Sequence, residues 1–167
     1  MIRGVRFKIP NEFGSFLRQI FDGIAVENYF WRLRDNDTFA SPIESFFSGE
    51  TYSGLEFKKM IERDNYYIVH LGLFAFPKKS DEEIYDYSSY LSSSAKLFLQ
   101  ITDCEFVDIY VKEEETLALL HEAAKKHEFT QIKFFTEENA RYNEDLSAMG
   151  PPIPLRGHWR EQSLEES

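Results

Sequence analysis

The sequence predicts a single α+β domain, with a mixed, mostly antiparallel β-sheet, a central buried strand and helices packed on that sheet. The first observation behind this prediction is the stretch YYIVHLGLFAF, residues 66–76, which Pro77 follows at once. If the stretch is extended, both of its faces are apolar apart from His70, as a strand covered on both sides requires. A helix here would be apolar all round and would run into the proline, so we predict a central strand.

The second observation is the pattern of the last third of the chain. Two apolar segments, residues 97–101 and 105–111, are separated by Thr102-Asp103-Cys104, which is typical of a tight hairpin. Three glutamates at 113–115 then open a helix, because carboxylates favour the positive end of the helix dipole. Residues 131–135 form the final strand. The second hairpin strand, the helix and this last strand predict a right-handed parallel crossover, which makes the sheet mixed.

The N-terminal part is predicted to supply two more strands and a helix. Apolar residues alternate with Arg6 and Lys8 over residues 5–9, which indicates a half-exposed strand. Residues 11–23 follow with helical spacing between an asparagine cap and a glycine stop. A second strand is predicted over residues 29–34, turning at Asp35-Asn36-Asp37.

Capping patterns predict further helices between these strands. Ser41-Pro42-Ile43-Glu44 has the residue types of a helix start, so a short helix is expected there, ending by Gly49. Ser53-Gly54-Leu55-Glu56 repeats the pattern and opens a helix that ends near Asn65. A weak helix is expected over the serine-rich residues 87–95.

We assign residues 1–143 to this domain and residues 144–167 to a C-terminal tail. A chain of 167 residues is long enough for one domain with a sizeable core. The tail contains Gly150-Pro151-Pro152-Ile153-Pro154 and a charged end, a composition typical of extended or disordered segments.

Composition limits the cellular setting and the partners. The net charge is −10, divided into +3 for residues 1–34 and −13 for the remainder. An acidic chain repels nucleic acid, so we expect no nucleic-acid partner, whereas a basic protein would suit it. Cys104 is the single cysteine, which rules out an internal disulfide framework. The N-terminus has no apolar signal region and no later run is long enough to span a membrane, so we expect a cytoplasmic protein without a membrane partner.

No motif predicts a cofactor or a metal. The sequence has neither a glycine-rich phosphate loop nor a GxSxG nucleophile elbow. His121 and His127 are six residues apart, which places them on different faces of a helix. Asp35-Asn36-Asp37 begins like a calcium loop, but Ala40 and Phe46 stand where that loop needs glycine and an acid.

Three residues carry an enzyme hypothesis. Cys104 has acidic neighbours that should raise its pKa, so a cysteine in a turn is the preferred interpretation over a nucleophile. His70 is the one polar residue of the central strand, and Asp108 lies in the middle of another predicted strand. The alternative function is therefore an enzyme whose site is assembled in three dimensions around His70 and Asp108, with Cys104 as a further candidate.

A basic stripe gives a third hypothesis. Arg6, Lys8, Arg32 and Arg34 would align if the first two strands were neighbours, and Phe30 would lie between them, as in an RNA-binding surface. The preferred interpretation is pairing across strands with a carboxylate such as Asp108 or Glu105.

The leading hypothesis is a non-enzymatic domain that binds another protein. Its predicted binding residues lie in the segment DEEIYDYSSY and combine acids with tyrosines, as surfaces that bind basic proteins commonly do; they are Asp81, Glu82, Glu83, Tyr85, Asp86 and Tyr87. A solvated connector is the simpler alternative for this segment. One concrete form of the hypothesis is an inhibitor or immunity-type partner of a basic toxin.

Three segments also resemble a known family. RGVRFKIPNEFGSFL near the start, NYYIVHLGLFAFPK in the middle and ITDCEFVDIYVK with a later TEEN are similar to a family of small uncharacterised proteins from Gram-positive spore-forming bacteria, DUF2691. The resemblance covers about residues 1–140 and does not extend to residues 150–167. It implies a single domain, and it implies no activity, cofactor or catalytic residue.

Overall fold

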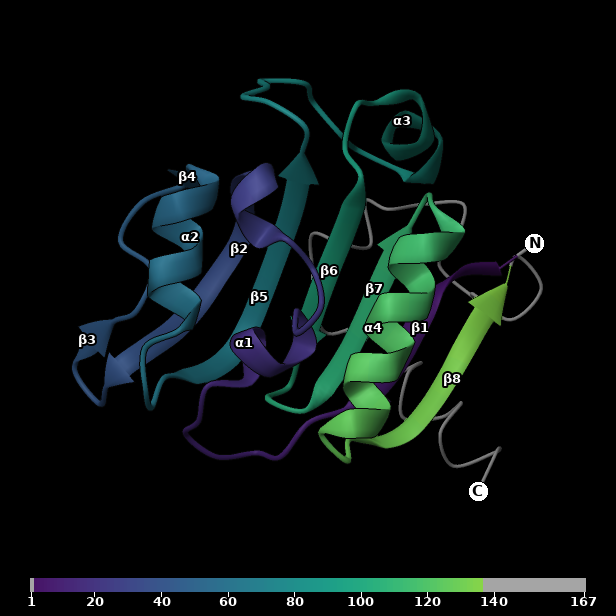
Figure 1. The fold of residues 1–167 in the computed structure, drawn as a ribbon. Helices are drawn as coiled ribbons and strands as arrows, with labels where there is room; N and C mark the ends of the chain where they lie inside the picture. The colour runs from purple at the N-terminus through teal and green to yellow at the C-terminus, as the bar shows by residue number, and fades with distance from the viewer. Residues whose placement is uncertain (1, 137–167) are drawn as a thin grey trace.

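An eight-stranded antiparallel β-sheet forms the framework of the protein, and its computed structural model describes residues 2–136 (Figure 1). The strands are β1 Ile2–Lys8, β2 Phe30–Ser41, β3 Glu44–Ser45, β4 Thr51–Tyr52, β5 Tyr67–Phe76, β6 Leu97–Thr102, β7 Phe106–Val111 and β8 Thr130–Thr136. Their order across the sheet is β3-β2-β5-β6-β7-β1-β8, and β4 pairs with β2 outside this path.

The predicted central strand is confirmed. β5 lies between β2 and β6, and its last six residues are all buried. The predicted hairpin is also confirmed as β6 and β7. β7 and β8 run parallel, as the crossover requires, but β1 lies between them and pairs antiparallel with each. Every strand pair in the described sheet is therefore antiparallel, and the sheet contains no parallel ladder.

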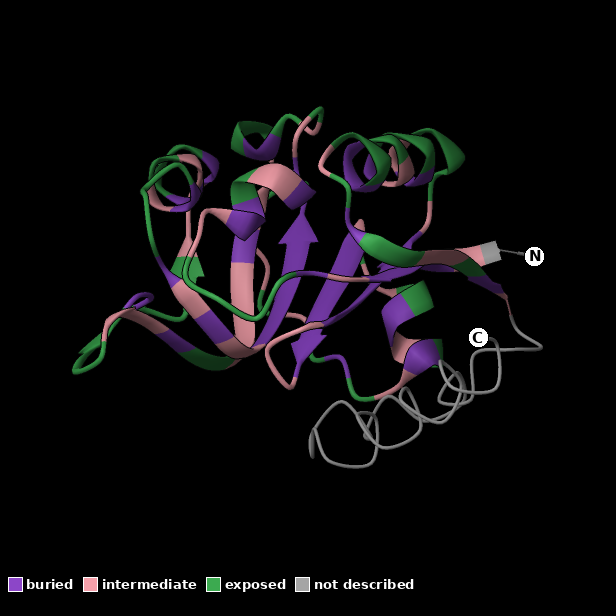
Figure 2. Cartoon of the chain, turned by 90° about the horizontal axis from the view of Figure 1, so that it is seen from below, coloured by how far each residue is buried: buried purple, intermediate pink, exposed green. Residues whose placement is uncertain are grey.

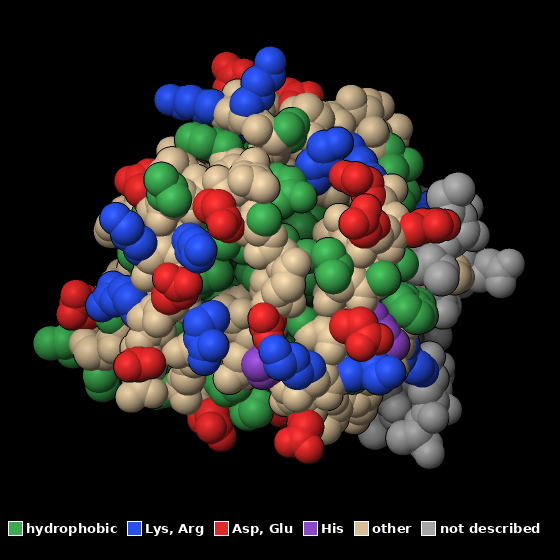
Figure 3. Space-filling model, in the orientation of Figure 1, with side chains coloured by type: hydrophobic (Ala, Val, Ile, Leu, Met, Phe, Trp, Pro, Cys, Tyr) green, Lys and Arg blue, Asp and Glu red, His purple; other side chains and the backbone are tan. Residues whose placement is uncertain are grey.

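Helices cover both faces of the sheet unequally. α1 Phe16–Ile20, α2 Gly54–Ile61 and α4 Glu114–Lys126 lie on one face together with the short 3₁₀ helix η1 Val26–Asn28. α3 Tyr87–Ser92 lies on the opposite face (Figure 2). We call these the helical face and the second face. On the helical face acidic and basic side chains are intermingled (Figure 3), so the acidic excess forms no large patch there.

The main core fills the space between the sheet and the three helices of the helical face. Its strand residues alternate along β1, β5, β6 and β7, because successive side chains of a strand point to opposite faces. Aromatic rings make up much of it: Trp31 stacks on Phe57 of α2 with ring centroids 4.1 Å apart. The Trp31 indole nitrogen donates to the carbonyl of Val26, so the one polar atom of this ring is satisfied.

A second, smaller core lies under α3. A row of aromatic residues from neighbouring strands, Phe74, Phe98, Tyr110 and Phe135, meets Tyr87 and Tyr90 of α3. β1 contributes Gly4 to this row, between Tyr110 and Phe135. Because glycine has no side chain, the Phe135 ring can reach the Tyr110 ring, and the two centroids are 5.0 Å apart.

Two local predictions are wrong. The predicted turn at residues 35–37 lies inside β2, which continues to Ser41. The pairing of β2 with β5 shifts register twice, on either side of these residues. The helix predicted over residues 41–49 is absent from this described segment, where β3 pairs back onto β2. Phe46 and Phe47 are both buried although adjacent, and Ile43 is 97 % exposed.

The first helix is shorter than predicted. α1 begins after Ser15 rather than after Asn11, and Phe13 is 41 % exposed instead of packing on the helix face. Gly14 makes a bridge to Tyr66, which holds the chain extended before the helix. The predicted stop at Gly23 is a left-handed turn, with φ of 98°. The predicted tail, residues 144–167, lies outside the described residues.

Candidate functional site

The predicted binding residues lie in the connection from β5 to α3, which we call the acidic connector, residues 81–87. Some of its carboxylates form hydrogen bonds within the fold that fix its conformation. Glu82 accepts hydrogen bonds from the backbone N–H of Ser94 at 3.1 Å and from the Ser80 hydroxyl at 2.8 Å. The Ser94 side chain and then Ser80 lower the pKa of Glu82, which keeps this carboxylate ionised at neutral pH.

Asp86 is the N-cap of α3 and forms a reciprocal capping box with Ser89. Its carboxylate accepts from the Ser89 backbone N–H at 2.8 Å, and this bond lowers the pKa of Asp86. Tyr87 is 8 % exposed and packs in the second core, with the guanidinium of Arg3 3.8 Å from its ring centroid. Glu82, Asp86 and Tyr87 therefore have structural contacts within the fold.

Arg32 of β2 anchors the acidic connector to the sheet. Its guanidinium donates to the carbonyl oxygen of Ser80 at 3.0 Å and to that of Glu82 at 2.6 Å. Ile84 is buried in the second core and provides an apolar anchor between these bonds and α3. The connector is irregular up to Tyr87, which begins α3, yet two polar anchors and one apolar anchor fix its path.

The remaining residues of the acidic connector face solvent. Asp81 and Glu83 are exposed, and Tyr85 is 62 % exposed. The Tyr85 hydroxyl donates to the Glu83 carboxylate, and this hydrogen bond raises the pKa of Tyr85. Leu91 of α3, which follows the connector in the sequence, is 51 % exposed. Two carboxylates and one aromatic ring thus point outward from the acidic connector.

A second cluster crosses the second face beside the aromatic row. It consists of residues directly opposite one another on six neighbouring strands, which we call the polar row: Asp35, Gly72, Gln100, Asp108, Arg6 and Lys133. Arg6 and Asp108 form a buried ion pair, with Nε 3.1 Å from Oδ1. Arg34 pairs with Asp35 at 2.8 Å at the other end. Desolvation raises the pKa of Asp35, and Arg34 offsets part of this effect.

The predicted pairing of the basic residues across strands is confirmed for Arg6 and Lys8, whereas Arg34 pairs with its chain neighbour Asp35 and Arg32 binds backbone carbonyls. Besides the Arg6–Asp108 pair, Lys8 Nζ lies 3.7 Å from Glu105 Oε1. The aligned basic stripe is wrong, because β1 and β2 are separated by β5, β6 and β7. Arg32 and Arg34 are therefore at the other side of the sheet from Arg6 and Lys8, and no continuous surface of this kind joins the four residues.

The three residues of the enzyme hypothesis lie in three separate places: on β5, on β7 and in the turn between β6 and β7. His70 of β5 and Asp108 of β7 have β6 between them, and Asp108 lines up through Gln100 with Gly72, two residues along β5 from His70, so their backbones are about 12 Å apart. The Asp103 backbone N–H points to Nδ1 of His70 at 3.5 Å. Asp108 is bound to Arg6, and Cys104 lies in the hairpin turn. A substrate would have to bridge these positions for the three groups to act together.

Cys104 contacts a tyrosine. Its sulfur lies 3.1 Å from the Tyr67 hydroxyl oxygen, and that hydroxyl also hydrogen-bonds the side-chain oxygen of Asn11. The contact with Cys104 raises the pKa of Tyr67 to about 12. Asp103 and Cys104 have φ of 52° and 69°, the left-handed conformation that tight hairpin turns of the primed types require. These observations place Cys104 in a structural turn, in agreement with the preferred interpretation of the sequence.

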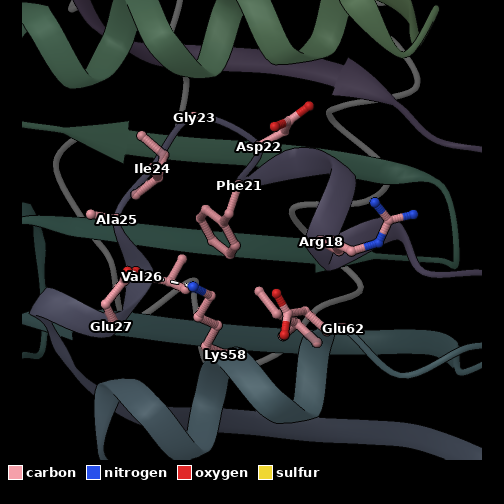
Figure 4. Close-up of a pocket in the computed structure, with 11 residues that line it drawn as sticks. Arg18, Phe21, Asp22, Gly23, Ile24, Ala25, Val26, Glu27, Lys58 and Glu62 are labelled. Carbon is pink, nitrogen blue, oxygen red and sulfur yellow. Dashed lines mark ion pairs between the residues drawn. The ribbon is translucent and has the colours of Figure 1, made fainter.

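The helical face carries an open cavity of about 350 Å³ between α1, η1 and α2 (Figure 4). Lys58 projects from α2 and pairs with Glu27 at 3.5 Å, while Phe21 contributes an apolar surface. Arg18 and Glu62 line the same cavity. The lining mixes both signs of charge and most of these groups are exposed, so the cavity selects no ligand class. Within residues 2–136, no group of three or more histidine, cysteine or acidic side chains could hold a metal ion.

The polar row was not predicted from the sequence. Gln100 and Lys133 each stand in a predicted strand, and a single glutamine inside the apolar run LFLQIT was a visible signal. The register that brings these residues into one line depends on pairings between distant strands, such as Arg6 with Asp108, which no local pattern indicates.

The antiparallel sheet with helices mainly on one face defines a small α+β domain. Its candidate sites are an exposed connector and a row of polar side chains, and the described residues contain no metal cluster. The chain belongs to the family described as "Protein of unknown function (DUF2691)", whose model matches residues 2–145. It is 32 % identical over 145 residues to the uncharacterized protein YncE of Bacillus subtilis (strain 168), covering 83 % of this chain and 95 % of that protein.

The family membership confirms the resemblance found in the sequence. No solved structure matches the chain. Among the described residues, no helix is both long and apolar enough to cross a membrane.

Proposed function

We propose that the protein is a non-enzymatic domain that binds a basic protein through its acidic connector. The observation that carries the proposal is the fixed path of the acidic connector, whose outward side chains are acidic and aromatic. Arg32 holds its backbone through two carbonyl oxygens, and Asp86 caps the helix that follows. A segment that is already ordered loses little conformational entropy on binding, which favours affinity.

The composition of the exposed side chains supports a protein partner. Aromatic residues such as Tyr85 are enriched in protein interfaces, and carboxylates such as Asp81 and Glu83 guide the approach of a basic partner. The overall charge of −10 also attracts a basic partner at long range. An inhibitor or immunity-type domain that neutralises a basic toxin is the specific form of this function that we favour, with the protein acting in the cytoplasm.

The test compares charge reversals at two places. Tagged wild-type protein and the variant Asp81→Lys/Glu83→Lys are used to capture partners from the native cell extract, followed by direct titration of the captured protein. Glu82 is left in place because it holds the connector to Ser94. We expect the reversal to weaken binding and to reduce its salt dependence.

The control is Glu44→Lys/Asp64→Lys, which changes the net charge equally at exposed positions far from the connector in sequence. Equal losses in both variants would show that only net charge matters, and unchanged binding in the connector variant would overturn the site. Tyr85→Ala separates the aromatic contribution from the charge, since it removes the ring and keeps both carboxylates.

A further inference from the structure

The strand β8 forms one outer edge of the sheet, and it differs from the opposite edge. Within residues 2–136 it pairs with β1 alone, whereas the outer side of β2 is covered by the short strands β3 and β4. Strands of two residues offer little backbone to another chain, but β8 has seven residues and contains no proline. An edge strand of this length is a template for pairing with a further strand.

The regular part of β8 is symmetric about Phe134. Gln131 has a left-handed backbone, with φ of 54°, and the pairing of β8 with β1 shifts register at this end of the strand. The regular part therefore runs from Ile132 to Thr136, with Phe134 in the middle. Phe134 points to the helical face and is 38 % exposed, although its ring stacks on His121 of α4 with centroids 4.6 Å apart. The edge of the sheet thus presents a partly exposed aromatic ring at its centre.

α4 carries a stripe of residues beside this edge, which we call the α4 stripe. Its members recur at helical spacing on the side of α4 that faces β8; they are Glu114, Ala118, His121 and Lys125. Glu114 and Ala118 line a hollow of about 440 Å³ together with Phe134, and His121 stacks on the same ring. The other side of α4 faces α1, where Lys126 binds Asp22. The α4 stripe is therefore next to the outer edge of the sheet.

The α4 stripe is complementary to itself when its direction is reversed. Glu114 stands at one end and Lys125 at the other, and both are exposed. Phe134 lies level with the middle of the stripe, because its ring stacks on His121 and lines the same hollow as Ala118. The centre of the regular part of β8 and the centre of the α4 stripe therefore coincide, although the two patterns belong to different elements.

We propose that two copies of the chain associate edge to edge through β8, related by a two-fold axis beside Phe134. The two β8 strands pair antiparallel, and Phe134 of each copy stands opposite Phe134 of the other. The same axis reverses the direction of α4, so Glu114 of one copy lies toward Lys125 of the other, and this pair forms twice. Such self-complementarity is what a two-fold dimer interface requires. The inference is independent of the acidic connector and of the function proposed for it.

Charge also selects this register. Lys133 is the one charged residue of β8. An axis beside Lys133 would place two lysines directly opposite each other, and like charges in this arrangement are destabilising. An axis beside Phe134 instead places Lys133 of each copy opposite Phe135 of the other, so the two lysines do not face each other.

The spacing of the elements suits the arrangement. α4 contacts β7, β1 and β8, and Figure 1 shows it in front of β1. The two α4 helices are then about three strand spacings apart, or about 14 Å, which exceeds the roughly 8–10 Å of helices in direct contact. The Phe134 and His121 rings of both copies lie in this gap, and the long side chains of Glu114 and Lys125 reach across it.

The experiment measures the mass of the full chain by analytical ultracentrifugation from micromolar to millimolar concentration. A salt concentration of about 0.15 M screens the repulsion between two chains that each carry a charge of −10. We expect the mass to rise from 19.7 kDa toward twice this value. Glu114→Lys and Lys125→Glu should each weaken the association about tenfold, because each reversal acts twice in a two-fold dimer.

Mixing the two variants is the decisive step. An equimolar mixture of Glu114→Lys and Lys125→Glu should regain the affinity of the wild type, because both contacts in the mixed dimer again join opposite charges. This recovery also shows that neither variant is unfolded. The controls are Glu115→Lys and Lys59→Glu, which make the same charge changes at exposed residues outside the α4 stripe and should associate as the wild type does.

Hydrogen exchange locates the strand that pairs. As the concentration rises, the backbone amides of residues 132–136 should exchange more slowly, because some of them become hydrogen-bonded to the second copy. The amides of β3 at the opposite edge serve as the internal control and should keep their exchange rates.

Three results would overturn the proposal. The first is a monomer at every concentration, which would show that the edge of β8 does not accept a second copy. The second is a dimer whose affinity does not recover when the two variants are mixed. The third is a dimer in which the β8 amides exchange as they do in the monomer, because the copies would then meet at another surface.

Discussion

Arg6 and Asp108 face each other across the ladder between β1 and β7, and form a buried two-point ion pair. Nε lies 3.1 Å from Oδ1, and Nη2 lies 3.5 Å from Oδ2. The residues are 102 positions apart in the sequence, so the pair joins the first strand to the last third of the chain. Both side chains are less than a tenth exposed. Buried charges of this kind are stable together and costly to separate.

The first prediction concerns this pair. Asp108→Leu or Arg6→Met alone removes one member of the ion pair while the other charge stays buried, and should lower the free energy of unfolding by about 3–5 kcal/mol. The double variant Arg6→Met/Asp108→Leu should recover most of that loss, since hydrocarbon replaces both charges. Urea unfolding of the three variants and the wild type measures the coupling. Additive losses in the double variant would contradict the assigned pairing.

The second prediction concerns Gly4, which lies between two aromatic rings of the second core. A β-carbon built there comes 2.0 Å from the carbonyl oxygen of Ile109 and 2.5 Å from the Phe135 ring. Gly4→Ala should therefore force β1 or Phe135 to move and lower the free energy of unfolding by about 1–3 kcal/mol. Near-ultraviolet circular dichroism should report the altered Tyr110–Phe135 contact. Gly49→Ala is the control, because its nearest neighbour lies 3.5 Å away.

The third prediction concerns pH. Asp22 accepts hydrogen bonds from Lys126 and His127, each at 2.8 Å, and these two bonds lower the pKa of its carboxyl below the usual 3.8. A carboxyl whose pKa falls on folding stabilises the protein above its unfolded pKa, and this contribution is lost as the pH drops through the folded value. Because the Asp22 side chain is more than a third exposed, Asp22→Asn should cost no more than about 1 kcal/mol at neutral pH.

The same variant should differ less and less from the wild type as the pH is lowered below 3.8. Denaturant titrations of both proteins over a series of pH values measure this difference. A gap that stays constant into the acid range would show that the charge of Asp22 does not connect α1 to the end of α4.

The fourth prediction concerns the hairpin turn. Cys104 has a left-handed backbone, with φ of 69°, which costs a residue with a side chain about 1–2 kcal/mol relative to glycine. Cys104→Gly should therefore be more stable than Cys104→Ala by about 1 kcal/mol. Both variants remove the sulfur next to Tyr67, so the comparison isolates the backbone. Equal thermal midpoints for the two variants would show that the turn is not strained.

Local signals predicted much of the fold. Ser53 and Glu56 form the capping box that the sequence indicated, with reciprocal bonds of 3.2 and 2.9 Å, because all the atoms involved belong to one helical turn. The hairpin at Asp103 and Cys104 and the apolar run of β5 are equally local. In each case the decisive contacts lie within a few residues of the signal, or depend only on burial of both faces of a strand.

The incorrect predictions have a long-range cause. Pro42 and Glu44 are residue types typical of a helix start, but β2 extends to Ser41 and β3 pairs back onto it. Phe46 and Phe47, which follow, are both buried in the core from successive positions. A helix would have placed these two rings about 100° apart on one surface. Pairing across the sheet therefore outweighed a weak local preference.

Of the two candidate sites, one was predictable from local sequence and the other depends on long-range pairing. The acidic connector was visible as a run of acids and tyrosines, although the structural roles of Glu82 and Asp86 depend on Ser94 and Ser89 and became apparent only in the fold. The polar row could not be predicted, because Gln100, Asp108 and Arg6 come into line only when β1 inserts beside β7.

The insertion of β1 between β7 and β8 has a consequence for how the chain folds. Among the described strands, β1 is made before its two neighbours β7 and β8, which follow about a hundred residues later. Pairing in the order of synthesis is possible for strands β2, β5, β6 and β7. β1 can pair only after β7 and β8 have been made. Contacts of such long sequence separation slow folding. We therefore expect β1, with its alternating apolar and basic residues, to stay unpaired during translation and to close the sheet in a late step together with β8.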